Sequence, residues 1–103
     1  MFTERKKDPF AESPNDILIR CLGKDNFTEW NEWRDNNRER HISLKGVSLR
    51  NVNLEGADFS QVDLNAADLK HANLKDSDLS EASLAGADLS YANLMGADLW
   101  KHL

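Results

Sequence analysis

Hydrophobic and polar residues recur with a five-residue period through the second half of the chain. From residue 42 to residue 101, each unit begins with an aliphatic or small residue, followed by a short polar residue and a large hydrophobic one. The third position is leucine in eleven of the twelve units and Phe59 in the other. The last two positions are mostly polar and include four glycines.

This period excludes a regular helix and a straight strand. On an α-helix, five residues advance by about 500°, so successive leucines would be spread around the axis. On a strand, an odd period places successive leucines on opposite faces. The chain must therefore turn once in every unit, which predicts a solenoid whose units bury their third residue against neighbouring units. The predicted core is Leu44, Leu49, Leu54, Phe59, Leu64, Leu69, Leu74, Leu79, Leu84, Leu89, Leu94 and Leu99.

The repeated motif points to a known family. Units such as Ala57-Asp58-Phe59, Ala67-Asp68-Leu69 and Ala97-Asp98-Leu99 follow the pattern A-(D/N)-L-X-X, which resembles the pentapeptide-repeat family. The resemblance implies an all-β solenoid, a right-handed quadrilateral β-helix with four units per coil. Residues 42–101 would then make about three coils.

The segment before the repeats has a different composition. Residues 1–12 are charged and expected to be a mobile tail. Ser13, Pro14 and an acid three residues after the serine predict a helix start, and Gly23 its end. A second helix is expected at residues 26–35.

Residues 13–41 are interpreted as a short helical cap on the first coil, because the terminal repeat of a solenoid needs a different covering element. The cap residues would be Leu22, Phe27, Trp30 and Trp33. The Trp-Asn-Glu-Trp-Arg segment at residues 30–34 also resembles leaders of bacterial pentapeptide-repeat proteins. The alternative is an aromatic ligand site or a peptide groove.

Charge and cysteine content restrict the partners and the compartment. The net charge of −5 argues against direct nucleic-acid binding, which depends on basic side chains. No apolar stretch approaches the length of a membrane span, so no membrane partner is expected. The single cysteine, Cys21, suits a reducing compartment and therefore the cytoplasm.

Four units per coil would stack side chains from successive coils. Asp58, Asp78 and Asp98 would form one column, and Asn53, Asn73 and Asn93 another. We expect each Asp to accept a hydrogen bond from the backbone of its own corner, and the Asn side chains to bond from coil to coil. An acidic stripe that binds a cation or mimics a row of phosphates is the alternative.

The last coil differs from the others at its outward positions. Tyr91, Met95 and Trp100 are large there, and Leu103 follows. Exposed apolar area beside an open edge favours association. We therefore expect an end-to-end homodimer or pairing with another solenoid chain. Alternatively, Trp100 and the tail at residues 102–103 fold over the end, and the protein stays monomeric.

Catalytic chemistry is not expected. No nucleophile has a plausible base, His41, His71 and His102 stand apart in the sequence, and neither a metal motif nor a cofactor motif is present. The predicted function is a non-enzymatic structural or protein-protein interaction module with an unidentified protein partner. The family resemblance implies one alternative, a DNA mimic acting on DNA gyrase.

Overall fold

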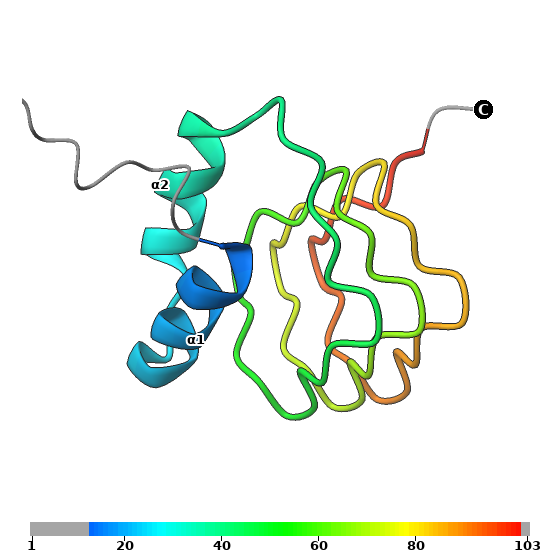
Figure 1. The fold of residues 1–103 in the computed structure, drawn as a ribbon. Helices are drawn as coiled ribbons and strands as arrows, with labels where there is room; N and C mark the ends of the chain where they lie inside the picture. The colour runs from blue at the N-terminus through cyan, green and yellow to red at the C-terminus, as the bar shows by residue number, and fades with distance from the viewer. Residues whose placement is uncertain (1–12, 102–103) are drawn as a thin grey trace, which may run out of the picture.

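The computed structural model describes residues 13–101 and shows two short helices followed by the repeats. Helix α1 spans Pro14–Lys24 and helix α2 spans Thr28–Asn36. The helices lie at one end of the stack of repeats, and the last repeats lie at the other (Figure 1). The predicted mobile tail at residues 1–12, Leu103 and the tail at 102–103 lie outside the described residues.

Helix α1 begins where the sequence indicates. The Ser13 hydroxyl accepts a hydrogen bond from the Asp16 amide, and the Asp16 carboxylate accepts one from the Ser13 amide, which completes a capping box. The helix ends at Lys24 instead of Gly23, since Asp25 takes the left-handed conformation that closes it (φ 59°). Aspartate tolerates this conformation better than most residues do.

Helix α2 starts two residues later than predicted. The Asn26 side chain accepts a hydrogen bond from the Thr28 amide (3.2 Å), which holds Asn26 ahead of the first helical turn. The two helices are tied together on the outside by an ion pair between Arg20 and Glu29. Ile17, Leu18 and Cys21 form the buried face of α1.

The repeats return to the same face every 20 residues. Parallel bridges join the second residue of each unit to the second residue four units later. The bridged residues form four columns of three: Ser43, Asp63 and Ser83; Ser48, Asp68 and Asp88; Asn53, Asn73 and Asn93; Asp58, Asp78 and Asp98. We refer to residues 42–61 as the first coil, 62–81 as the middle coil and 82–101 as the last coil.

Every unit turns at its last two residues. The amide of Val47 donates to the carbonyl of Leu44 (3.0 Å), and the same bond recurs at most of the later corners. The fifth residue of the unit has a positive φ, both at Gly46 (73°) and at a non-glycine residue such as Ala66 (61°). This conformation explains the glycines in the repeat, because L side chains disfavour it.

Burial of the third-position residues falls along the solenoid. Those of the first and middle coils, from Leu44 to Leu79, are at most 3% exposed. In the last coil, Leu84, Leu89 and Leu94 are only partly buried, and Leu99 is 49% exposed. Leu99 belongs to the predicted core but is half exposed, which agrees with the apolar open edge expected at the last coil, since no described coil lies beyond it.

Candidate interaction surfaces at the two ends of the solenoid

Adjacent coils are joined by three backbone hydrogen bonds in every unit. In the first unit, the amides of Leu44 and Gly46 donate to carbonyls of the middle coil, and the carbonyl of Ile42 accepts from the amide of Asp63. The same three bonds recur in each unit of the first and middle coils. Each coil therefore presents two donors and one acceptor per unit toward the C-terminal side. Toward the N-terminal side it presents two acceptors and one donor.

On the N-terminal side of the first coil, side chains of α2 occupy these backbone groups in the fourth unit, residues 57–61. Trp30 Nε1 donates to the carbonyl of Asp58 (2.6 Å), and Arg34 Nη2 donates to the carbonyl of Ser60 (2.5 Å). Asn31 Oδ1 accepts from the Asp58 amide (2.8 Å). On this face, α2 thus supplies the two donors and the one acceptor that a preceding coil would supply.

A further bond and an aromatic cluster join α2 to the first coil. Asn31 Nδ2 donates to the carbonyl of Gly56 (3.0 Å). Phe59, the one aromatic residue at the third position, lies 5.5 Å from Trp30 and 6.0 Å from Phe27, measured between ring centroids. Trp33 lies 5.7 Å from Trp30. Trp33 is 7% exposed and the other aromatic residues less, so little aromatic surface is left for a ligand.

Leu22 does not take part in this contact. It was predicted among the cap residues, but its side chain is 38% exposed. Ile17, Leu18 and Cys21, which the helical spacing places on one face with Leu22, are buried as that spacing predicts. Arg34 was not among the predicted site residues, although it is 1% exposed and bonds directly to the first coil. Its position four residues after Trp30, on the same side of the helix, is the sequence signal that could have indicated it.

Charges meet where α2 passes the first coil. Arg38 bridges Asp35 (2.7 Å) and Asp58 (2.5 Å). Burial by itself raises the pKa of the Asp58 carboxyl, but the hydrogen bonds from Arg38 and Ser60 outweigh it and the pKa lies below its ordinary value. Burial also lowers the pKa of the Arg34 guanidinium. The Asp58 carboxylate is therefore held charged and tied to the helix.

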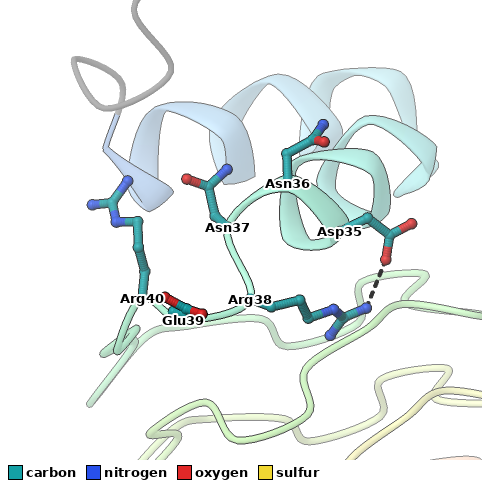
Figure 2. A pocket seen from close by; sticks show the side chains of 6 residues that line it. All are labelled: Asp35, Asn36, Asn37, Arg38, Glu39 and Arg40. Atoms are coloured by element: carbon teal, nitrogen blue, oxygen red, sulfur yellow. Dashed lines mark hydrogen bonds and ion pairs between the residues drawn. The ribbon is translucent and has the colours of Figure 1, made fainter.

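An open pocket of about 310 Å³ lies beside this ion pair, at the junction between α2 and the repeats. Figure 2 shows Arg38 directed toward Asp35, while Arg40 extends on the other side of the pocket, near Asn37. The guanidinium carbon of Arg40 lies 5.2 Å from the ring centroid of Trp33. The lining thus carries both signs of charge and does not single out one class of ligand.

At the other end, most backbone groups on the C-terminal side of the last coil have no bonding partner among the described residues, although the carbonyl of Ala82 accepts a hydrogen bond from Lys101 Nζ (3.4 Å). Within the described residues, amides at the third and fifth positions of the last coil donate to no protein acceptor: Leu84, Gly86, Leu89, Tyr91, Leu94, Gly96 and Leu99. The carbonyls of Ala87, Ala92 and Ala97 likewise accept no backbone bond. We call this side of residues 82–101 the C-terminal edge.

Large side chains surround the C-terminal edge. Tyr91, Met95 and Trp100 are 79%, 68% and 60% exposed. An open pocket of about 340 Å³ is lined mainly by the two ends of the last coil, including Leu84, Leu99 and Trp100, with Leu79 of the middle coil. The edge therefore combines unbonded backbone groups with exposed apolar area.

The Asp column makes all of the hydrogen bonds expected of it, and the Asn column makes some of them. Asp58, Asp78 and Asp98 each accept a hydrogen bond from the amide two residues later, at 2.9–3.1 Å, so the corner-bonding interpretation is confirmed. In the Asn column, Asn73 Nδ2 donates to Asn53 Oδ1 (3.1 Å).

The residues that could support chemistry are separated. Burial raises the pKa of the Cys21 thiol, which disfavours the reactive thiolate. His71, which showed no partner in the sequence, stacks on Tyr91 with 4.9 Å between ring centroids. Among residues 13–101, no group of three histidines, cysteines or acids could hold a metal ion. Neither helix described here has the length and apolar character needed to cross a membrane.

Comparison with protein families identifies the repeats. The model of pentapeptide repeats matches residues 40–65 and 63–100. The chain belongs to the pentapeptide-repeat family. Its fold is accordingly a β-helix solenoid, right-handed as in the family, in which isolated bridges join the coils in place of continuous strands.

Several solved pentapeptide-repeat proteins are similar to this chain. Rfr23 from the cyanobacterium Cyanothece 51142 is 32% identical over 56% of this chain and 43% of its own, with a TM-score of 0.53. HetL, described as involved in heterocyst differentiation regulation in Nostoc, is 34% identical over 55% of this chain and 30% of its own, with a TM-score of 0.32. A pentapeptide-repeat protein of the Arabidopsis thaliana thylakoid lumen is 32% identical over 62% of this chain and 51% of its own, with a TM-score of 0.35.

The pentapeptide-repeat chain described here spans about half the length of these proteins or less. No curated protein matches it.

Proposed function

We propose that this pentapeptide-repeat chain is a non-enzymatic protein-interaction module that binds a protein partner through its C-terminal edge. In this proposal, residues 13–41 are a cap, residues 42–101 form a rigid rod of three coils, and the flat faces keep the edge in a fixed shape. The buried, unpaired Cys21 suits a reducing compartment, and we place the protein in the cytoplasm.

The unbonded backbone of the last coil carries this proposal. A row of amides with no protein acceptor is a template for pairing with another chain. Natural proteins protect such edges with charges, prolines or a covering element. Here the rim instead presents Tyr91, Met95 and Trp100, which are apolar or aromatic and well exposed. Aromatic residues and methionine are enriched in protein interfaces.

The DNA-mimic alternative has less support from the charges. Asp58 is paired with Arg38, and Asp68 with Arg50 (3.0 Å), so two of the column carboxylates are neutralised by arginine. A phosphate-like row would need uncompensated negative charge along one face. We therefore do not propose gyrase as the target.

Site-specific photo-crosslinking in cells that express the full chain tests the proposed edge. A photoreactive amino acid is placed at Met95 or, as the matched control, at Lys75. The two residues occupy the same position of the repeat, 20 residues apart, on the last and middle coils. The proposal predicts a discrete crosslinked protein, either a second copy or another chain, from position 95 and none from position 75. Equal crosslinking from both positions, or none from position 95, contradicts it.

A further inference from the structure

The two sides of a coil are not equivalent in hydrogen bonding. The C-terminal side of each unit presents two amides and one carbonyl, and the N-terminal side presents two carbonyls and one amide. The two sides match only when the C-terminal side of one coil meets the N-terminal side of the next. The C-terminal edge, which has an excess of donors, therefore needs a surface with an excess of carbonyl acceptors.

Two C-terminal edges are a poor match for each other. If a second copy met the edge tail to tail, each unit would contribute two donors and one acceptor from both sides. At most two bonds per unit could then form, and one amide on each side would lose its water without gaining an acceptor. A buried polar group without a partner costs about 1–3 kcal/mol. The pairing that satisfies every group is head to tail.

On this basis, which rests on the proposed function, we infer that the partner is another pentapeptide-repeat solenoid whose first coil is uncovered. Its N-terminal side supplies the carbonyl-rich surface, and its aliphatic columns continue those that end at Leu84, Leu89, Leu94 and Leu99. The junction repeats the coil-to-coil bonds of the rod, so the two chains form one longer solenoid.

The same geometry assigns a second role to α2. Trp30, Asn31 and Arg34 occupy the backbone groups of Asp58 and Ser60 that a docking coil would use. Ile42, Leu44 and Leu49 at this end are at most 3% exposed, whereas Leu99 at the other end is 49% exposed. Helix α2 thus prevents copies of this chain from docking head to tail on one another, and it leaves the C-terminal edge for a different chain.

Removing the α2 contacts in the full chain should uncover its first coil, so that the C-terminal edge of one copy can dock on the first coil of another. We compare three proteins by sedimentation over a range of concentrations: the wild type, the variant W30A/N31A/R34A, and the control E32A/N36A. The control changes exposed residues of the same helix. We expect the first variant to form an open series of increasing masses, while the wild type and the control keep a single mass.

A second change distinguishes docking from unfolding. Adding M95E and L99E to the α2 variant places carboxylates at the C-terminal edge, where they should restore a single mass if the series forms by docking. Aggregation caused by unfolding would persist in that variant. If W30A/N31A/R34A loses amide protection in the middle coil, the milder variant N31A/R34M, which keeps the Trp30 packing, is used with the same expectation.

Two results overturn the inference. One is a folded α2 variant that keeps the mass of the wild type at every concentration. The other is a wild-type dimer abolished by M95E and L99E, which would show that two donor-rich edges pair tail to tail. The second result would leave the proposed interaction edge intact, so the two proposals can fail separately.

Discussion

Asn31 offers a sharp measurement of how strongly α2 is bound to the first coil. Its side chain donates to the carbonyl of Gly56 and accepts from the amide of Asp58, at 3.0 and 2.8 Å. At about 1 kcal/mol for each bond, Asn31→Ala should lose about 2 kcal/mol, offset by up to about 0.7 kcal/mol of helix propensity. Asn36→Ala is the matched control, because Asn36 lies on the same helix and bonds only to a carbonyl of α2 (3.1 Å).

Urea unfolding followed by tryptophan fluorescence gives both free energies of unfolding. We expect Asn31→Ala to be about 1–2 kcal/mol less stable than Asn36→Ala, because two bonds to the first coil are lost against one exposed bond within α2, with the same dependence on urea in both variants. If the two variants unfold at the same urea concentration, the Asn31 bonds do not hold α2 on the first coil. The interpretation that α2 takes the place of a preceding coil would then be refuted.

Three other variants examine the interior and the charged contact. Leu74→Ala, at a fully buried position, should cost ~2–5 kcal/mol in urea unfolding, whereas Lys75→Ala should cost almost nothing; equal losses would refute the inward and outward assignment. Ser77→Ala should raise the melting temperature by several degrees in calorimetry, because the buried Ser77 hydroxyl has no hydrogen-bond partner among the described residues and stands where most units have alanine. An unchanged or lower melting temperature would show that the Ser77 hydroxyl is hydrogen-bonded. Folding lowers the pKa of the Asp58 carboxyl, so the stabilisation by the charged carboxylate is present above the ordinary carboxyl pKa and is lost as the pH falls through the folded value. In acid unfolding below about pH 5, Asp58→Asn should therefore lose less stability than the wild type. Parallel curves of stability against pH would contradict this.

The period of five was sufficient to predict the solenoid, because neither a helix nor a strand can bury leucines at that spacing. The corner bonds of Asp58 and its column also followed from the sequence, since they connect residues two apart in the chain. Capping of α1 by Ser13 and Asp16 is equally local. Features that depend on neighbouring residues were therefore predictable.

Features that depend on the docking of α2 were not predictable. The bonds from Asn31 and Arg34 to the first coil join residues more than 20 positions apart, and the sequence does not show which backbone groups of the repeats these side chains reach. Leu22 was misplaced for the same reason: the helical spacing puts it beside the buried Ile17, Leu18 and Cys21, but its own side chain is 38% exposed in the docked helix.

Amide hydrogen exchange of the dilute full chain compares amides of the middle coil with the equivalent amides of the last coil. The amides of Leu64 and Leu69 donate to the last coil, whereas those of Leu84 and Leu89 have no protein acceptor among the described residues. We predict that Leu64 and Leu69 exchange slowly and that Leu84 and Leu89, 20 residues later at the same corners, exchange nearly as fast as an unfolded peptide. Equal protection at both levels would contradict an open C-terminal edge.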